Sequence, residues 1–335
     1  MPLHDDYTAI REGAAIGAIS PRRHLAVAGD DRASYLQGLL TNDIVALTPG
    51  TGCYAAWLTP QGRMLTDMHV LESGGMILLD LPAEQAAPTL ARLEQFIFTE
   101  DVRVGSMADV LTCVWVHGPL AAHVLERTLD GAPLDGWGNY RHTQLEFRGE
   151  PVSVARIDQL SVPGYGVYLE RTREALLVEA MQAAGASVVA AEAIEAARIE
   201  AGYPVFGVDM TDVTIPLEAG IEDRAISLTK GCYVGQEVII RVLHRGGGRV
   251  AKRLVALRIG TPEGGPHTPP RGAQLFAGER EIGEVTSAAE SPRLGAIALG
   301  YVHRDFVAPG TQVEVGTDAG RVPATVTARP IPSAA

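Results

Sequence analysis

Apolar residues in the first two-thirds of the chain follow two patterns, and the commoner one predicts short strands. Runs rich in aliphatic, aromatic and β-branched residues are bounded by turn-forming residues, as in strands that end at turns. Residues 73–75 and 148–150 are glycine-containing turns between two such runs, and each predicts a hairpin. The predicted strands cover residues 24–29, 52–59, 64–72, 76–81, 111–117, 144–147 and 151–157.

The second pattern places apolar residues three and four positions apart, which predicts helices between these strands. Asp30 and Asp31 offer capping oxygens to a first helix, and Thr172 offers one to a later helix. Pro88 lies inside the second predicted helix and could shorten it to its second half. The helices are one after Asp31, residues 83–98, one beginning at Pro119, residues 172–184, and residues 191–201, which Gly202 ends.

The pattern changes after the three glycines at 246–248. Short strand-like runs then follow one another, separated by Gly- and Pro-rich turns and without a clear helix signal. This pattern is typical of a small antiparallel barrel. The runs are 253–259, 273–276, 281–286, 296–302, 311–315 and 322–327, with a surface loop at 260–272. We therefore predict an α+β protein with a mixed region at 1–248 and an antiparallel β-barrel domain at 249–330.

Composition supports a globular protein with a hydrophobic core. Of the 335 residues 46% are hydrophobic and 20% are charged, a balance that suggests about two domains. The chain has no apolar run of membrane-spanning length, and its first residues do not resemble a secretory signal, so we expect a cytoplasmic protein. The net charge of −12 disfavours direct binding to nucleic acid or to an anionic membrane.

One segment departs from this acidic character. Between residues 238 and 258 there are six basic residues and no acidic one. The run is a candidate anion-binding surface, or else a solvated face that distant carboxylates balance in space. Its members are Arg241, Arg245, Arg249, Lys252, Arg253 and Arg258.

Cysteine, histidine and acidic residues form no recognisable metal or nucleotide motif. Cys53 and Cys113 lie in apolar strand-like runs and are interpreted as small core residues. No CxxC, HExxH, GxSxG or phosphate-binding glycine motif occurs. Asp209 and Asp212 could touch a cation, but loop carboxylates more commonly cap turns. We therefore predict no metal site.

Residues 230–237 carry the most informative chemistry, with the sequence KGCYVGQE. Two glycines bracket Cys232, so the backbone can turn tightly and approach a ligand. Lys230 is nearby, and Arg241 and Arg245 follow; positive charge favours the thiolate and makes a cysteine nucleophilic. The other interpretation of the chemistry alone is a packed cysteine in a glycine turn.

These eight residues resemble the K-G-C-[FY]-x-G-Q-E signature of YgfZ-type proteins. The segments 198–209 and 216–218 resemble the R-x-E-x-G, G-x-D and P-x-E run of the wider glycine-cleavage T-protein superfamily. Residues 36–43 resemble the T-N-D helix end of that superfamily, and residues 282–287 and 296–302 resemble its barrel. The resemblance covers nearly the whole chain.

The resemblance implies a folate-binding protein in which two interleaved α+β subdomains and the barrel form a ring around a central cavity. It aligns Asp67, within residues 62–67, with the aspartate beside the reactive folate nitrogen of aminomethyltransferases. A carboxylate there stabilises positive charge as it forms. We expect tetrahydrofolate, or a one-carbon derivative, to contact Asp67, Tyr203, Gln236, Arg241 and Arg245.

One departure from the superfamily concerns the pterin ring. Aminomethyltransferases carry a glutamate that holds the pterin, in a segment that corresponds here to residues 161–169, where no glutamate stands at that place. A buried pterin edge would lose a charge-assisted partner worth about 1.5–3 kcal/mol. The absence argues against ordinary glycine-cleavage catalysis and fits the YgfZ branch better.

Three hypotheses follow. The first is a folate-dependent accessory protein that supports iron–sulfur cluster assembly or repair, including iron–sulfur enzymes that modify tRNA, with Cys232, Asp67 and Lys230 as functional residues. The second is a folate-dependent aminomethyltransferase or methyltransferase with Asp67 as its catalytic carboxylate. The third is a scaffold for an iron–sulfur or tRNA-modifying partner without a small-molecule ligand.

Overall fold

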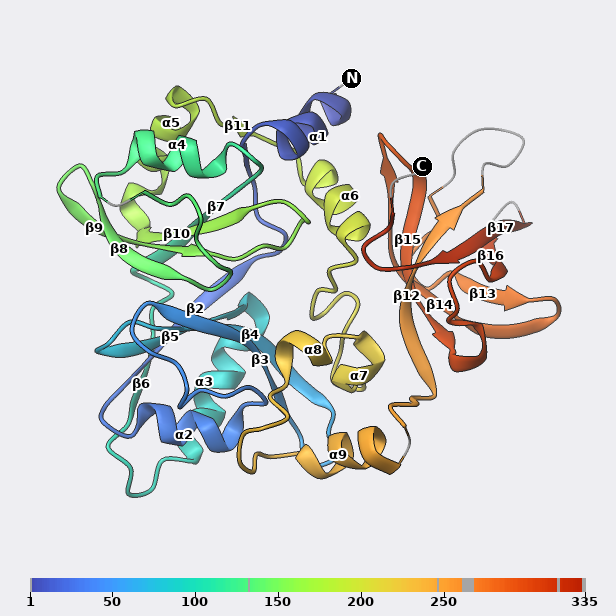
Figure 1. Cartoon of the computed structure of the whole chain (residues 1–335), viewed down its shortest axis with the longest axis horizontal. Helices are drawn as coiled ribbons and strands as arrows, with labels where there is room; N and C mark the ends of the chain where they lie inside the picture. Colours follow the sequence, from blue (N-terminus) through green and yellow to red (C-terminus); the bar gives the residue numbers. More distant parts are fainter. Residues whose placement is uncertain (1, 132, 246, 261–267, 318–319, 333–335) are drawn as a thin grey trace.

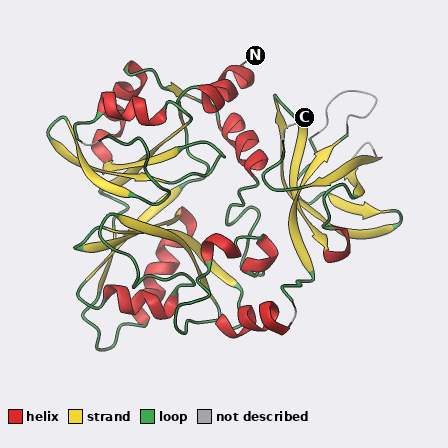
Figure 2. Ribbon diagram, in the orientation of Figure 1, coloured by secondary structure: helices red, strands yellow, loops and turns green. Residues whose placement is uncertain are grey.

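The computed structural model describes residues 2–131, 133–245, 247–260, 268–317 and 320–332. Two sheets with their covering helices lie one above the other, and a β-barrel lies beside them (Figure 1). A mainly helical segment separates the sheets from the barrel (Figure 2). The α+β class and the antiparallel C-terminal barrel predicted from the sequence are confirmed.

The first sheet is built from strands in the order β3-β4-β5-β2-β6, all antiparallel. Its helices cover one face, where Leu36, Trp57 and Leu79 are buried in a continuous apolar core. The elements are β2 (Arg22–Ala28), α2 (Arg32–Leu39), β3 (Thr51–Leu58), β4 (Met64–Glu72), β5 (Met76–Pro82), the 3-10 turn η1 (Ala83–Gln85), α3 (Ala86–Gln95) and β6 (Arg103–Ser106).

The second sheet has the order β11-β1-β7-β10-β9-β8. Strand β1 precedes every strand of the first sheet in the sequence, and the other strands of the second sheet follow that sheet. The two sheets are therefore interleaved along the chain. Val116, Leu125 and Val167 belong to its separate core. The elements are β1 (Ala15–Ile16), β7 (Leu111–His117), α4 (Ala121–Thr128), β8 (His142–Phe147), β9 (Glu150–Arg156), β10 (Gly164–Glu170), η2 (Arg171–Arg173), α5 (Glu174–Ala183) and β11 (Ser187–Val188).

The C-terminal strands close into an antiparallel barrel in the order β12-β15-β14-β13-β16-β17. Valine, leucine and alanine from alternating positions fill its interior, as in other small barrels. The elements are β12 (Lys252–Ile259), β13 (Gln274–Ala277), β14 (Arg280–Ser291), β15 (Gly295–His303), η3 (Arg304–Phe306), β16 (Gln312–Thr317) and β17 (Gly320–Thr327). Most of the predicted loop at 260–272 lies outside the described residues.

Helices between the sheets and the barrel connect the two parts. They are α1 (Pro2–Glu12), α6 (Ala191–Ala201), α7 (Pro216–Ala219), α8 (Glu222–Ala225) and α9 (Gln236–Arg245). Glu200 at the end of α6 is buried and accepts hydrogen bonds from Tyr7, Arg11 and Arg293, with oxygen–donor distances of 2.7–2.9 Å, and from Ser291. One carboxylate therefore joins α1, α6 and the barrel.

A second buried carboxylate, Asp209, attaches the loop after α6 to strand β14. Its Oδ2 accepts from Arg198 Nη1 at 2.8 Å, and its Oδ1 accepts from the Thr286 and Ser287 hydroxyls at 2.5 and 2.7 Å. Adjacent strand residues normally point to opposite faces. Here the register shifts between Val285 and Ser287, so Thr286 is an extra residue in a bulge. The bulge lets both hydroxyls reach one oxygen.

Three local predictions were wrong. Asp31 occupies the N-cap position of α2, but its side chain makes no cap and instead accepts from the Asp101 N–H at 2.9 Å. Pro88 does not shorten α3, because it lies in the first turn, where its missing N–H has no helical partner. Thr172 lies within η2 and donates to Glu170 rather than capping α5. The elements α1, β1, β6, β10, β11, α7, α8 and α9 were not predicted.

Buried histidines in this fold predict instability in acid. Burial lowers the pKa of His69 to about 3 and that of His117 to about 4, and it also lowers the pKa of His24. The unfolded chain takes up protons on these residues below about pH 6.5, whereas the folded chain does not. Each one therefore lowers the free energy of unfolding by up to about 1.4 kcal/mol per pH unit below that value.

Urea unfolding at pH 7.5 and pH 5.5 checks this expectation, with a lower midpoint expected at pH 5.5. His117→Phe should flatten the pH dependence, because it removes one titrating group from the buried set. His123→Gln, at an exposed position, is the matched control and should leave the slope unchanged. Equal midpoints at the two pH values would contradict the prediction.

Candidate functional site

The two sheets face each other across a set of buried and half-buried polar side chains, which we call the central polar cluster. Apolar residues of both sheets, including Leu78, Trp115 and Ala155, pack around it. The cluster combines two carboxylates, two guanidinium groups and several aromatic hydroxyls in a region that contains little water-accessible surface. Its members are Arg22, Tyr54, Asp67, His69, Asp80, Tyr140, Gln159, Tyr168, Tyr203 and Arg224.

Asp67, on strand β4, has the geometry of a ligand-binding carboxylate. Its side chain is 3% exposed, and Oδ2 accepts a hydrogen bond from Tyr54 Oη at 2.5 Å. Oδ1 is buried and has no hydrogen-bond partner among the described residues. Burial raises the pKa of Asp67, although Arg22 and Arg224 oppose the rise. The unpaired oxygen is therefore poised to accept a proton or an N–H group from a ligand.

The other carboxylate, Asp80, is fully committed to protein contacts. It accepts from Arg22 Nε at 2.5 Å and from Tyr168 Oη at 2.8 Å. Burial alone would raise the pKa of Asp80, but Arg22 and the nearby histidines hold it below its usual range. The two carboxylates therefore differ in pKa: Asp80 stays ionised, and Asp67 binds a proton more readily. Such a pair is suited to acid–base chemistry.

Arg224, on helix α8, is the functional candidate that sequence reasoning missed. Its guanidinium carbon lies 4.7 Å from the centre of the Tyr54 ring and 4.1 Å from the centre of the Tyr203 ring. Its Nε and Nη2 are buried without a hydrogen-bond partner among the described residues. In the sequence Arg224 follows two acidic residues and is typical of a solvated charge run. Only the fold shows that it enters the cluster.

His69 and Gln159 link the remaining members. His69 Nδ1 lies 3.0 Å from Tyr140 Oη, and its Nε2 lies 3.3 Å from Gln159 Nε2. Gln159 Nε2 also donates to Tyr203 Oη at 3.4 Å. Since burial lowers the pKa of His69 to about 3, the imidazole is neutral at physiological pH. These contacts fix the orientation of Tyr203 and of the Gln159 amide.

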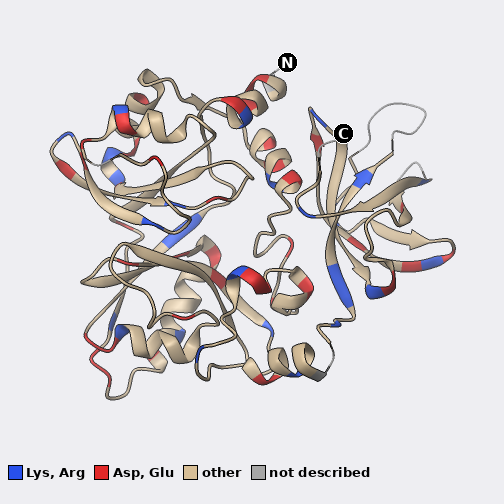
Figure 3. Ribbon diagram, in the orientation of Figure 1, with Lys and Arg blue, Asp and Glu red and all other residues tan. Residues whose placement is uncertain are grey.

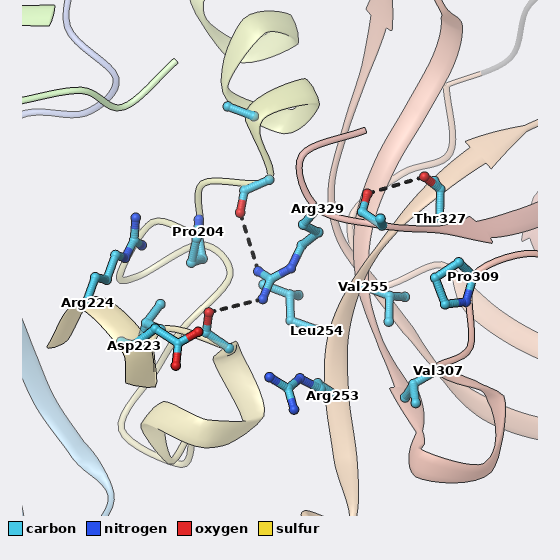
Figure 4. Close-up of a pocket in the computed structure, with 15 residues that line it drawn as sticks. Pro204, Asp223, Arg224, Arg253, Leu254, Val255, Val307, Pro309, Thr327 and Arg329 are labelled. Atoms are coloured by element: carbon cyan, nitrogen blue, oxygen red, sulfur yellow. Dashed lines mark hydrogen bonds between the residues drawn. The ribbon is translucent and has the colours of Figure 1, made fainter. Parts of the chain in front are cut away.

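Two pockets adjoin the cluster and share Pro204 as a wall. The first is lined by Asp67, Trp115, Gln159 and Tyr203, and has about 10 Å³ of free space, room for about one water molecule. The second, of about 530 Å³, lies between α8 and the barrel (Figure 4). Asp67 and Tyr203 from the predicted site thus lie together. Residues 203–206 line the narrow pocket.

Lys230 has a packing role that its motif did not reveal. Its Nζ donates to the carbonyl oxygens of Gln37, Leu40 and Asn42 at 2.7, 2.6 and 2.8 Å. These carbonyls lie at and beyond the C-terminal end of α2, where backbone acceptors lack helical partners. Burial lowers the pKa of Lys230 to about 8. Lys230 therefore anchors the loop that contains Cys232 to helix α2 and to the segment that follows it.

Gly235 of the same motif is required by close packing. Its φ is +84°, and a Cβ at this position would lie 2.4 Å from the carbonyl oxygen of Thr59. Cys232, in contrast, is exposed. It lines neither of the two pockets beside the central polar cluster. Packing explains Lys230 and Gly235, but it does not explain the cysteine between them.

The other predicted contacts of folate lie away from the central polar cluster. Gln236 begins α9, Arg241 is exposed on the same helix, and the side chain of Arg245 lies outside the described residues. The basic run is divided between α9 and strand β12 (Figure 3), where Arg253 pairs with Glu222 at 2.7 Å. Arg253 is the member of the run that lines the larger pocket.

The three thiols should react very differently. Burial raises the pKa of Cys53 to about 12 and raises that of Cys113 well above the usual range, so both remain protonated and slow to react. Titration of the native protein with Ellman's reagent should modify one thiol rapidly, and Cys232→Ala should remove that fast phase. All three should react in denaturant. A fast phase that persists in Cys232→Ala would contradict the exposure pattern.

No metal centre is formed by the residues that the structure describes. These residues contain no group of three or more His, Cys, Asp or Glu side chains with ligand geometry. Asp209 is occupied by its contacts with Arg198, Thr286 and Ser287, and Asp212 is exposed. In the same described part of the chain, none of the helices has the length and apolar character that a membrane span requires.

Comparison with known proteins gives a consistent result across the chain. Residues 2–230 match the GCVT N-terminal domain, and residues 252–331 match the glycine cleavage T-protein C-terminal barrel domain. The aminomethyltransferase of Thermosynechococcus vestitus is 29% identical, over 98% of this chain and 89% of that protein. The aminomethyltransferase of Bacillus subtilis is 26% identical, over 93% of this chain and 86% of that protein.

A solved structure extends the similarity to the fold. The glycine cleavage system aminomethyltransferase T from Bartonella henselae superposes with a TM-score of 0.87, covering 98% of this chain and 89% of its own. Its sequence is 23% identical to this chain, so this comparison speaks for the fold alone. The arrangement of two sheets and a closed barrel is therefore shared with that protein.

Proposed function

The chain belongs to the glycine cleavage T-protein family, and on that premise we propose that it binds tetrahydrofolate and transfers a one-carbon unit. Two of the relatives it resembles are named aminomethyltransferases. The pterin binds at the central polar cluster. We also propose that the folate-binding region covers residues 1–248 and the barrel domain residues 249–330. The observation that carries the proposal is the buried, unpaired Oδ1 of Asp67 beside a pocket.

The residues of the cluster have separate tasks in this proposal. Bound tetrahydrofolate supplies the nitrogen that accepts the one-carbon unit. Asp67 holds the proton or the positive charge that develops at that nitrogen, since its raised pKa favours proton exchange and its Oδ1 is free. Tyr54 fixes the carboxylate through Oδ2 at 2.5 Å. Asp80 and Arg22 hold the surrounding strands without entering the reaction.

Gln159 supplies a polar contact where the sequence lacks the pterin glutamate. It lines the narrow pocket beside Asp67, is 5% exposed, and its amide is already oriented by His69 and Tyr203. An amide offers both a donor and an acceptor to a pterin edge, but no charge. Pterin recognition is therefore weaker per contact here than with a carboxylate, and Asp67 contributes a larger share of it.

Ligand entry requires movement of residues 203–206. The space beside Asp67 is about 10 Å³, far below the volume of a bicyclic ring. Tyr203 lines this space, and Pro204 lines both this space and the larger pocket. Displacing them joins the two pockets into one channel. Trp115 lines the narrow pocket, so its fluorescence should change when a ligand arrives.

Calorimetric titration with tetrahydrofolate, with tryptophan fluorescence in parallel, tests the proposal. Saturable binding together with a fluorescence change is expected, and Trp115→Phe should remove most of that change without preventing binding. p-Aminobenzoylglutamate, which lacks the pterin, should bind far more weakly. Absence of tetrahydrofolate binding at millimolar concentration would contradict the folate-binding function.

A second function is favoured by a specific observation at the Cys232 loop. The loop matches the YgfZ-type signature, its lysine and glycine are explained by packing, and its thiol is exposed outside both pockets beside the cluster. Such a thiol can reach a partner protein. We therefore keep support of iron–sulfur cluster assembly or repair, with an iron–sulfur partner, as the alternative function.

The two functions are separable by variants. In a strain that lacks this protein, Cys232→Ala should fail to restore iron–sulfur enzyme activity if the accessory function holds, while its binding of tetrahydrofolate stays normal. Full restoration of iron–sulfur enzymes by Cys232→Ala would remove the role of the cysteine. Release of ammonia from an aminomethylated lipoyl carrier, dependent on tetrahydrofolate, would support transfer chemistry.

A further inference from the structure

We propose that a third pocket, which we call the Trp137 pocket, binds a small aromatic anion: a flat ring that carries a carboxylate, sulfonate or phosphate group. The pocket is lined by residues 49–52 at the start of β3, and by Pro133 and residues 137–143, which lead into β8. Its volume of about 710 Å³ is typical of small-molecule sites. None of the described residues that line it also lines either pocket beside the central polar cluster. The site therefore does not depend on the proposed folate function.

Hydrogen bonds hold the two walls of the Trp137 pocket in place. The backbone N–H of His142 donates to the carbonyl oxygen of Gly50 at 2.9 Å, which joins one wall to the other. The indole N–H of Trp137 donates to the carbonyl oxygen of Pro133 at 3.1 Å, and this side chain is 5% exposed. The walls are therefore preorganised, which lowers the cost of ordering them around a ligand.

Tyr140 occupies a strained position in this wall. Its φ is +66°, in the left-handed region, which is rare for a residue with a large side chain. Such conformations cost about 1–3 kcal/mol and are concentrated at ligand sites. The Tyr140 hydroxyl lies 3.0 Å from Nδ1 of His69, so Tyr140 belongs both to this pocket and to the central polar cluster. The contact with His69 fixes the tyrosine ring as part of the wall.

Arg141 gives the Trp137 pocket a positive charge. Its guanidinium carbon lies 5.4 Å from the centre of the Trp137 ring. No carboxylate among the described residues lies within ion-pair distance of Arg141, and none of those that line the pocket is acidic. A guanidinium group that stacks on an aromatic ring keeps its N–H groups available to a planar or tetrahedral anion. The charge therefore favours an anionic ligand.

His142 adds a buried polar atom that the protein leaves unused. Its side chain is 5% exposed, and Nε2 has no hydrogen-bond partner in the part of the chain that the structure describes. Burial lowers the pKa of His142, so the imidazole is neutral at physiological pH and offers one donor and one acceptor. Buried polar atoms normally have a partner. A buried imidazole and an exposed guanidinium suit a ring with a polar edge inside the pocket and its anionic group toward solvent.

Fluorescence titration with 1-anilinonaphthalene-8-sulfonate tests the charge of the ligand, because this probe is an aromatic anion that brightens in apolar sites. N-phenyl-1-naphthylamine, which has the same rings without the sulfonate, is the neutral comparison. Arg141→Gln should weaken the sulfonate about tenfold, since it removes one charge-assisted contact, and should leave the neutral probe unchanged. Arg148→Gln is the matched control and should affect neither probe. The Arg148 guanidinium carbon lies 5.3 Å from the centre of the Phe147 ring, outside the pocket.

Gly138→Leu tests the location of the site. Gly138 lines the pocket, and a Cβ at this position would meet no atom within 4 Å, so the leucine fills open space. Binding of both probes should be lost. Gly105→Leu is the matched control, because Gly105 is exposed on β6, at the opposite edge of the first sheet from β3, and its Cβ also would meet no atom within 4 Å. It should bind both probes as the wild type does, and thermal melts establish that each variant is folded.

Two results would overturn the proposal. The first is that the sulfonate does not bind the wild type, or binds Arg141→Gln and Gly138→Leu as it binds the wild type. The second is that tetrahydrofolate raises the apparent Kd of the probe in direct proportion to its concentration, since the probe would then occupy the folate site. In either case saturable binding of tetrahydrofolate leaves the folate function intact. If tetrahydrofolate does not bind but the two variants lose the probe as expected, the folate function fails and this pocket stands.

Discussion

Asp67→Asn is expected to be more heat-stable than the wild type and nearly inactive. The raised pKa of Asp67 means that the folded protein disfavours the ionised carboxylate relative to the unfolded chain. At any pH above the pKa that Asp67 has in the unfolded chain, ionisation of Asp67 therefore lowers the free energy of unfolding. Asparagine removes this unfavourable charge, and its side-chain oxygen still accepts the hydrogen bond from Tyr54.

The loss of activity follows from the same change. An amide cannot take up a proton or balance a developing positive charge, so turnover should fall by about 10²–10³-fold. Thermal melts at pH 7.5 and a coupled assay of tetrahydrofolate-dependent ammonia release measure the two effects. If the wild type shows no turnover, the affinity for tetrahydrofolate replaces the rate as the second measurement.

Tyr54→Phe is the control for this pair of effects. It leaves the Asp67 charge in place and removes the single hydrogen bond that the carboxylate accepts within the described residues. It should therefore lower stability, the opposite of Asp67→Asn. An Asp67→Asn protein that melts earlier and keeps its activity would show that the carboxylate is structural, and the proposed role would be lost.

Asp209→Ala should destabilise the protein by about 3–5 kcal/mol, the usual effect of removing one partner of a buried ion pair. The change removes the buried one of the two carboxylates that Arg198 pairs with, leaving the partly exposed Glu195, and it leaves the Val205 N–H and the hydroxyls of Thr286 and Ser287 without the Asp209 acceptor. This is a large share of a typical stability of about 5–15 kcal/mol. Urea unfolding, followed by circular dichroism, measures the loss.

Asp212→Ala is the matched control on the same loop. Asp212 is exposed, so its removal should shift the urea midpoint little. Asp209→Asn should lie between the two, because an amide keeps an acceptor oxygen but loses the charge that Arg198 needs. Equal midpoints for Asp209→Ala and Asp212→Ala would mean that the buried carboxylate does not hold the barrel in place.

The regular elements were predictable because their signals are local. Strand β4 and helix α6 have the predicted bounds, since apolar periodicity and the flanking glycines act within a few residues. The two-residue strands β1 and β11 were missed because they exist only through pairing with each other and with β7. The caps assigned to Asp31 and Thr172 failed for the same reason, as long-range or neighbouring partners captured their side chains.

The site was predictable only where the family resemblance supplied positions. Asp67 and Tyr203, 136 positions apart in the sequence, both line the narrow pocket, and their contact with folate stays a prediction. Arg224 and Gln159 carry no sequence signal, because each is an ordinary polar residue whose meaning depends on what the fold places beside it. Lys230 had the opposite problem: its position in a cysteine motif suggested chemistry, whereas three carbonyls use its charge.

Closure of the barrel and its attachment to Asp209 depend on different features of the sequence, and the bulge at Thr286 concerns only the attachment. Closure of the barrel depends on alternation of apolar side chains, which many sequences satisfy. Attachment to Asp209 depends on Thr286, the extra residue in strand β14 where it pairs with β15. Deleting Thr286 would restore a regular ladder and still remove the paired hydroxyls. The extra residue in a single strand, together with the two hydroxyl side chains at that point, therefore encodes how the barrel is attached to the rest of the chain.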